Sequence, residues 1–92
     1  CFLYGTEFTP FEHQYIAGNN MAVLTKAAYL EFSLCAAACA AVTAFKCRSI
    51  ELDYRDMACK LQTVTPYYAP DAFLFLLSYN VTYYQRHCQY GR

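Results

Sequence analysis

The chain has 92 residues, of which 58% are hydrophobic and 15% charged, and seven basic residues balance seven acidic ones. This length predicts one domain spanning residues 1–92. Zero net charge argues against a nucleic-acid partner, because proteins that bind nucleic acids present a basic surface. No apolar segment of the sequence approaches the ~20 residues of a membrane-spanning helix.

Short apolar segments indicate the strands at the start of the chain. Gly5 ends the first of them, and Thr9-Pro10 marks a bend or a sheet edge. Residues 18–20, Gly-Asn-Asn, are a strong turn signal. The expected strands are residues 1–4, beside the last strand of the chain, and residues 13–16, while residues 21–24 are apolar again.

An alanine-rich segment predicts one helix. Thr25 suits the N-cap position, and Cys35 and Cys39 follow at helical spacing. The alanines around these cysteines are the best helix formers and have almost no bulk, so this helix can lie very close to a sheet. The helix is expected over residues 26–43, with a later start near Ser33 as the alternative.

A change of period after the helix predicts a β-hairpin. Residues 45–54 alternate with a period of two, as a strand does. Residues 53–56 supply a charged turn, and residues 57–61 alternate again as the return strand.

The last third of the chain is expected to complete the sheet. Residues 62–70 contain two prolines and predict an exposed loop. Residues 72–77 are six apolar residues without alternation, which predicts a strand covered on both faces. Residues 81–88 form the closing strand, which Gly91 ends. The whole is expected to be a small α+β domain: an antiparallel sheet of about five strands with one helix packed across it.

Six cysteines in so short a chain predict disulfide bonds and a secreted, extracellular protein. Cys35 and Cys39 share one helical face and need two partners on the sheet beneath. Cys47 and Cys59, on neighbouring strands, are the natural candidates. Six cysteines allow 15 pairings, and a Cys35–Cys39 bond is the main local alternative, although it needs unusual geometry across one helical turn. The favoured pairs are Cys35–Cys59 and Cys39–Cys47, which leaves Cys1–Cys88.

Several cysteine-bearing motifs follow one another along the chain. They are Cys35-x3-Cys39, Phe45-Lys46-Cys47-Arg48-Ser49, the strand ending in Asp53, Cys59-Lys60-Leu61 and Tyr84-Gln85-Arg86-His87-Cys88. Eleven residues separate Cys47 from Cys59. Over nearly the whole chain this pattern resembles the PAN/apple superfamily, and six cysteines resemble its apple subtype, in which the first and last are paired. The alanine-rich helix and residues 72–77 depart from the family's pattern.

Three positions are candidates for glycosylation. Asn80-Val81-Thr82 is an N-x-Thr sequon, which in a secreted protein accepts an N-linked glycan, although short sequons also arise by chance. A glycan there would shield the neighbouring apolar strand from wrong pairing. Thr9 and Thr65 each precede proline and are weaker candidates for O-linked glycans.

Ten tyrosines and an apolar surplus indicate contacts with a partner. Ordinary packing is the alternative for most of the tyrosines. The first functional hypothesis is a glycosylated structural subunit that assembles into a homo-oligomer or polymer through a heterologous, non-closing contact. The residues expected at this contact are Tyr67, Tyr68, Phe73, Phe75 and Leu77.

The second hypothesis is a recognition module, because the resemblance implies a unit that binds proteins or carbohydrates. A sugar would lie on tyrosine rings and be held by a few polar groups. The polar groups considered are Asn19, Gln62 and Arg86.

The titratable residues do not form a recognisable catalytic or metal-binding pattern. His13 and His87 have no serine or free cysteine partner that suggests nucleophilic chemistry. The acidic residues of the hairpin lack the glycine and the ligand count of a calcium loop. We therefore expect no enzymatic activity, no metal and no cofactor, and a solvated charged rim that Arg48 and Arg55 neutralise. The acidic residues are Glu51, Asp53 and Asp56.

Overall fold

The computed structural model describes residue 1 and residues 3–18, 20–67 and 70–90. The predictions made for Asn19, Tyr68 and Gly91 therefore lie outside the described residues. In chain order the elements are β1 (Leu3–Glu12), β2 (Gln14–Ile16), β3 (Asn20–Leu24), the 3-10 helix η1 (Ala27–Leu30), α1 (Phe32–Ala41), β4 (Ser49–Asp53), β5 (Ala58–Gln62), the 3-10 helix η2 (Pro70–Ala72), β6 (Phe73–Phe75) and β7 (Val81–Tyr90).

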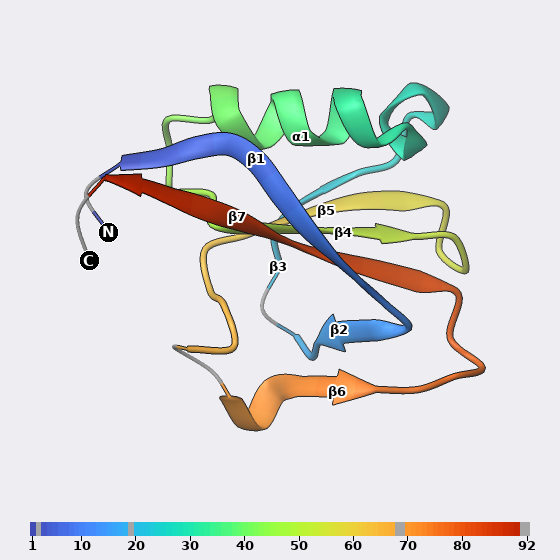
Figure 1. Cartoon of the computed structure of the whole chain (residues 1–92). Coiled ribbons are helices and arrows are strands. Elements are labelled where there is room, and N and C mark those ends of the chain that lie inside the picture. The colour runs from blue at the N-terminus through green and yellow to red at the C-terminus, as the bar shows by residue number, and fades with distance from the viewer. Residues whose placement is uncertain (2, 19, 68–69, 91–92) are drawn as a thin grey trace.

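The strands form two antiparallel sheets. The larger sheet has five strands in the order β1-β7-β4-β5-β3, and β2 pairs with β6 in a separate two-stranded sheet. Figure 1 shows α1 over one face of the larger sheet and the β2–β6 pair on the opposite side. The predicted α+β architecture, with one helix across a five-stranded antiparallel sheet, is therefore confirmed, and the two-stranded sheet is an addition to it.

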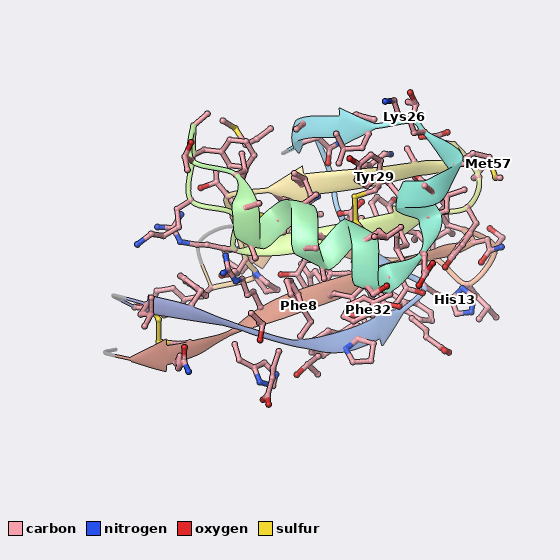
Figure 2. All side chains as sticks on the ribbon, turned by 90° about the horizontal axis from the view of Figure 1, so that it is seen from above. Phe8, His13, Lys26, Tyr29, Phe32 and Met57 are labelled. Carbon is pink, nitrogen blue, oxygen red and sulfur yellow. A yellow bond between two sulfur atoms is a disulfide. The ribbon has the colours of Figure 1, made fainter. Side chains whose placement is uncertain are left out.

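The central strands β4 and β5 are buried at every residue. On the side of α1 they build the apolar core, which consists of Cys35, Cys39, Cys47, Ile50, Leu52, Cys59 and Leu61. Figure 2, seen from above, shows α1 lying across the sheet, with Phe8 of β1 beside Phe32 at the start of the helix. The centroids of these two rings are 5.8 Å apart.

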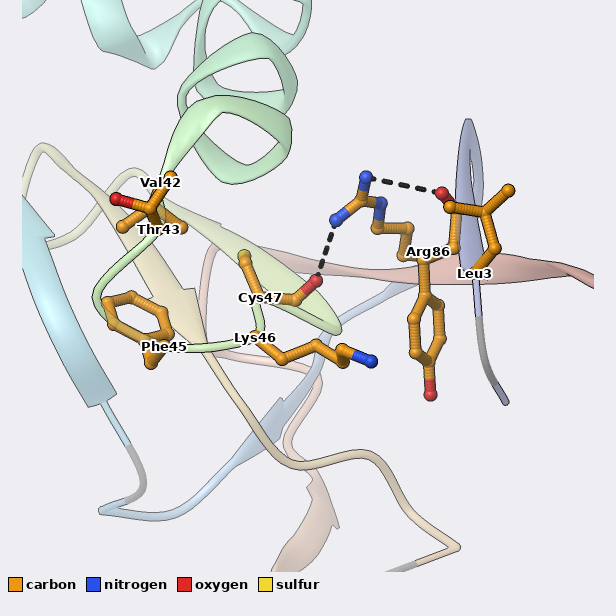
Figure 3. Close-up of a pocket in the computed structure, with 8 residues that line it drawn as sticks. Leu3, Val42, Thr43, Phe45, Lys46, Cys47 and Arg86 are labelled. Carbon is orange, nitrogen blue, oxygen red and sulfur yellow. Dashed lines mark hydrogen bonds between the residues drawn. The ribbon is translucent and has the colours of Figure 1, made fainter.

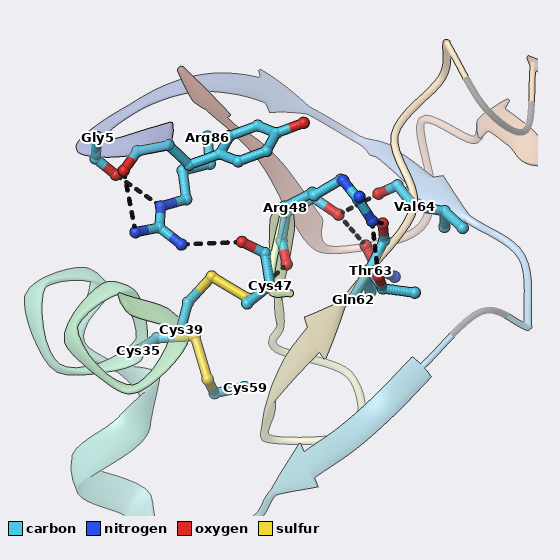
Figure 4. Close-up of a disulfide and its surroundings, with 12 residues drawn as sticks. Gly5, Cys35, Cys39, Cys47, Arg48, Cys59, Gln62, Thr63, Val64 and Arg86 are labelled. Carbon is cyan, nitrogen blue, oxygen red and sulfur yellow. Dashed lines mark hydrogen bonds between the residues drawn. A yellow bond between two sulfur atoms is a disulfide. The ribbon is translucent and has the colours of Figure 1, made fainter. Parts of the chain in front are cut away.

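Three disulfides cross-link the fold at sequence separations of 87, 24 and 8 residues, and they are the three pairs that the sequence favours. Cys35–Cys59 ties α1 to β5 with a Cα separation of 5.8 Å, and Cys39–Cys47 ties the helix to the segment before β4 at 5.3 Å. Figure 4 shows these two bonds extending from the helix towards the strands. The third, Cys1–Cys88, joins the start of the chain to β7 at 5.8 Å.

The helix begins at Phe32, close to the later of the two starts considered. Lys26 and Glu31 both have extended backbone angles, so the 3-10 helix η1 is separated from α1 by a bend. No side chain caps the first turn of α1, and Thr25 is not its N-cap. The helix ends at Ala41, where Val42 returns to an extended conformation.

Strand β1 is longer than expected. Gly5 lies inside it rather than at its end, and Thr9-Pro10 lies on a sheet edge, one of the two positions expected for it. Proline is tolerated because β1 is an edge strand that pairs only with β7, so one side of its backbone needs no ladder hydrogen bond. The register shifts twice between Leu3 and Phe8, which accommodates Gly5 in an irregular stretch.

The expectation of a doubly covered strand at residues 72–77 is wrong. Only Phe73–Phe75 forms a strand, β6, which pairs with β2 alone. The chain then turns, with the Tyr79 N–H donating to the Leu76 carbonyl at 3.0 Å. The β2–β6 pair lies outside the larger sheet, and the side chains of residues 74–77 remain 40–69% exposed.

Candidate functional site

The face of β4 and β5 turned away from α1 carries a buried polar layer. The expectation of a solvated rim is wrong for Glu51 and Asp53, because β2 and Tyr79 cover them. Of the three acidic residues, only Asp56 keeps a half-exposed side chain. The hairpin has the predicted alternation of polar and apolar residues, but its polar face is buried instead of facing solvent. The layer consists of Ser49, Glu51, Asp53, Lys60 and Gln62.

Asp53 is the most heavily hydrogen-bonded carboxylate in this layer. Its Oδ2 accepts from Lys60 Nζ at 2.7 Å and from the hydroxyl of Tyr79. Its Oδ1 accepts from the backbone N–H groups of Arg55 and Asp56, both at 3.0 Å. Burial alone would raise the pKa of Asp53, but the bonds from Lys60 and Tyr79 outweigh it and lower that pKa. Burial and the bond to Asp53 raise the pKa of Tyr79 to about 12.

Glu51 lies deeper in the layer and has a different electrostatic environment. Its Oε2 accepts from the backbone N–H of Ile16 at 2.7 Å and from Gln62 Nε2 at 2.6 Å. These bonds only partly offset burial, which raises the pKa of the Glu51 carboxyl. Gln62 is fully used, because Nε2 also donates to Asn20 Oδ1 and Oε1 accepts from Ser49.

A polar cleft of about 310 Å³ opens onto this layer. Two aromatic rings form part of its wall: the centroids of Tyr15 and Tyr79 are 4.9 Å apart at an interplanar angle of 64°. The guanidinium of Arg55 lies 4.2 Å from the centroid of the Tyr79 ring. The polar cleft is defined here by Tyr15, Glu51, Arg55, Asp56, Lys60 and Tyr79.

A second cavity, of about 440 Å³, lies between the segment after α1 and the N-terminal end of β1. Figure 3 shows Lys46 and Arg86 on its polar side and Val42 and Phe45 opposite. Arg86 Nη1 donates to the Cys47 carbonyl at 2.9 Å, and Nε donates to the Gly5 carbonyl at 2.6 Å. These bonds, drawn in Figure 4, give Arg86 a structural role in joining β1, β7 and the segment before β4.

The polar groups expected to hold a sugar do not come together. The amide of Gln62 is enclosed in the polar layer, while Arg86 lies at the second cavity and is bonded to backbone carbonyls. Asn19 is outside the described residues. Sequence reasoning missed Tyr15 and Tyr79, and it gave Arg55 only the role of neutralising acidic neighbours. These three residues lie far apart along the chain, so no local motif links them.

Only some of the residues expected at a partner contact are exposed. Tyr67, Phe75 and Leu77 have exposed fractions of 86%, 63% and 69%. Phe73 instead packs inward, with its ring 5.0 Å from that of Tyr83 and 6.1 Å from that of Phe11. Tyr68 is outside the described residues. Leu74 and Leu76 add to the exposed apolar segment, which we call the 74–77 segment.

The candidate glycosylation positions differ in accessibility. Asn80 is exposed at the turn before β7, and its carbonyl accepts from the Tyr54 N–H at 2.9 Å. Thr65 is buried. Thr9 is partly buried and hydrogen-bonds to Nε2 of His87.

The contact between Thr9 and His87 also joins a third residue, Glu7. Nδ1 of His87 lies 3.7 Å from a carboxylate oxygen of Glu7, so an acid, an imidazole and a hydroxyl follow one another. Thr9 was missed as a partner of His87 because it is 78 residues away in the sequence. The carboxylate side chain is 85% exposed, so water screens the group.

Residues 1, 3–18, 20–67 and 70–90 contain no group of three or more His, Cys, Asp or Glu side chains arranged to hold a metal ion. Within the same residues, no helix has the length and apolar character that crossing a membrane requires. Comparisons of the chain with protein-family models, with curated proteins and with solved structures return no match.

Proposed function

We propose that this chain is a secreted, non-enzymatic module of the PAN/apple type that assembles with copies of itself into a glycosylated extracellular fibre. The observation that carries the proposal is the 74–77 segment, four consecutive apolar side chains that remain exposed. Contiguous exposed apolar surface usually marks a contact with another molecule. A small α+β domain with three disulfides is compatible with the PAN/apple fold and with an oxidising compartment.

The geometry of the contact decides between a closed dimer and a fibre. If two copies met through the same surface, the contact would close as a dimer. Other exposed apolar side chains lie elsewhere, including Met21 and Val23 on the edge strand β3. A contact between the 74–77 segment of one copy and a different surface of the next repeats without closing, and so produces a fibre.

The test compares assembly of the native chain with that of a double substitution, Phe75→Ser with Leu77→Ser. We expect fibres for the native chain in negative-stain electron microscopy, and monomers for the double variant in size-exclusion chromatography with light scattering. The control is Met57→Ser, which removes another apolar side chain that is more than half exposed, from the β4–β5 turn, and should leave assembly unchanged.

Two results would contradict the proposal. A native chain that remains a monodisperse monomer at high concentration would remove self-assembly altogether. Fibres formed equally well by the double variant would show that the contact lies on another surface.

Carbohydrate recognition is a second candidate function, and the polar cleft favours it. Tyrosine rings beside charged groups in a cleft suit a ligand with both apolar and hydrogen-bonding faces. A glycan array probed with the glycosidase-treated protein tests this function. If no glycan is bound at any protein concentration used, the recognition function is wrong.

A further inference from the structure

The polar cleft contains hydrogen-bonding groups that the described part of the chain does not use. The guanidinium of Arg55 packs on the Tyr79 ring but makes no hydrogen bond or ion pair there. Asp56 binds Lys60 through Oδ2 only, which leaves Oδ1 available. Asn20 accepts from Gln62 through its side-chain oxygen, so its amide nitrogen remains a donor.

One buried charge separates this cleft from an ordinary surface hollow. Glu51 lines it while being only 2% exposed, and both bonds to its carboxylate go to one oxygen, Oε2. Because a buried carboxylate gains from every further donor it meets, the second oxygen of this lining residue is an acceptor that a ligand in the cleft can use.

The entrance to the cleft is open at Gly18. This residue has a φ of +73°, and apart from its two chain neighbours no residue has a heavy atom within 4 Å of the position that a Cβ would occupy. Tyr15 and Leu76 provide apolar surface beside it. The volume of about 310 Å³ is at the small end of the range of about 300–1,000 Å³ typical of ligand pockets.

The charges of the lining select against a simple ion. Arg55 and Lys60 balance Glu51 and Asp56. The ammonium of Lys60 already binds Asp53 at 2.7 Å and Asp56 at 3.0 Å, so it offers an anion little. A neutral ligand whose groups both donate and accept satisfies the lining better, and a hydroxyl group does both.

We propose that the polar cleft binds a saccharide through two adjacent hydroxyl groups. Arg55 donates to them, Asp56 accepts from them, and the apolar face of the sugar ring rests on Tyr15. The proposal rests on the recognition function above, for which it names the site and the ligand chemistry. A cleft with an aromatic wall, an unused guanidinium and two carboxylate acceptors supports it.

The experiment is a titration of the deglycosylated, isotope-labelled chain with methyl glycosides of glucose, galactose, mannose and N-acetylglucosamine, followed by backbone amide NMR signals. We expect saturable shifts of the Gly18, Arg55 and Asp56 signals with at least one glycoside. Arg55→Met keeps a long unbranched side chain beside Tyr79 and removes the donors, so binding should weaken about tenfold, which corresponds to about 1.4 kcal/mol.

The matched control is Lys46→Met, which removes a cation at the second cavity and should leave binding unchanged. If no glycoside shifts the cleft signals, or if Arg55→Met binds as well as the native chain, the proposal is wrong. Shifts confined to the second cavity would overturn the cleft but keep the recognition function. A blank glycan array would remove both.

Discussion

Asp53 is a buried carboxylate that remains ionised because its partners are fixed around it. Lys60, the Tyr79 hydroxyl and two backbone N–H groups occupy its two oxygens. Because folding lowers its pKa from the ordinary value of 3.8, ionised Asp53 stabilises the fold at pH values above 3.8. This stabilisation is lost as the pH falls through the folded-state pKa. The charges of Asp53 and Lys60 stabilise each other, since neither side chain is well solvated.

Asp53→Asn should therefore destabilise the fold by about 3–5 kcal/mol, because it leaves the Lys60 ammonium buried without its main partner. Urea unfolding with the disulfides intact measures this change. Asp71→Asn, at an exposed position, is the matched control and should have almost no effect. A loss below about 1 kcal/mol for Asp53→Asn would mean that the pair is not structurally important.

Glu51 changes the pH dependence of stability in the opposite direction to Asp53. Its raised pKa means that the folded state holds the Glu51 proton more tightly than the unfolded chain does. Between the ordinary value of 4.5 and the raised folded value, stability therefore falls as the pH rises.

Glu51→Gln keeps an acceptor for the Ile16 N–H and removes the charge. At pH 7 we expect it to be more stable than the native chain, by about 1.4 kcal/mol for each unit by which folding raises the pKa. The difference should vanish in acid, where Glu51 is protonated in both states. Unfolding curves across pH measure it, with Glu12→Gln as the exposed control. The expectation would be contradicted if the stability of the variant relative to the native chain were lower at pH 7 than in acid.

The burial of these two carboxylates could not be predicted from the hairpin itself. A period of two shows which residues share a face of a strand, but not what covers that face. The cover comes from Ile16 and Tyr79, which are 35 residues from Glu51 and 26 from Asp53 respectively. Local pattern therefore placed the side chains correctly and described their surroundings wrongly.

The elements most accurately predicted are those bound by cysteines. Alanine propensity and the Cys35–Cys39 spacing located α1 and the face that it turns to the sheet. Alternation predicted the hairpin over residues 45–54 and 57–61, and its strands are Ser49–Asp53 and Ala58–Gln62, so the first strand begins four residues later than expected. The failures lie where local signals compete with sheet position: Gly5 does not end β1, and an apolar segment became the exposed β6.

The three disulfides should differ in their accessibility to a reductant. The Cys35–Cys59 and Cys39–Cys47 pairs are buried beneath α1, whereas Cys88 is exposed on β7. Because exchange requires a thiolate to reach a sulfur atom, we expect Cys1–Cys88 to be reduced first under native conditions.

Brief treatment with a mild thiol, alkylation and peptide mass mapping measure the order of reduction. Labels on Cys1 and Cys88 alone are the expected early product. The control is the same treatment in denaturant, where burial is lost and all six cysteines should be labelled together. Early labelling of Cys35 or Cys59 in the native protein would contradict the burial described here.

At the level of the whole molecule, a formal net charge of zero affects association. Copies of a neutral chain do not repel one another at long range, so apolar contacts such as the 74–77 segment can act. At about pH 4 the carboxylates begin to protonate, and the chain gains net positive charge.

Fibre formation should therefore be strongest near neutral pH and weaken in acid, as measured by light scattering. Added salt should restore part of the assembly in acid, because it screens the repulsion between copies. Assembly that is strongest in acid and insensitive to salt would indicate that the contact is not governed by net charge.

The Cys1–Cys88 bond has a mechanical consequence. β1 and β7 run antiparallel side by side (Figure 1), and this bond closes the end at which Leu3 faces Tyr90. Tension applied through the two cysteines travels along the covalent bond and bypasses the sheet, so the domain does not lengthen under load. Once the bond is reduced, the same tension peels β1 from β7 one pair at a time, and a rigid link becomes an extensible one.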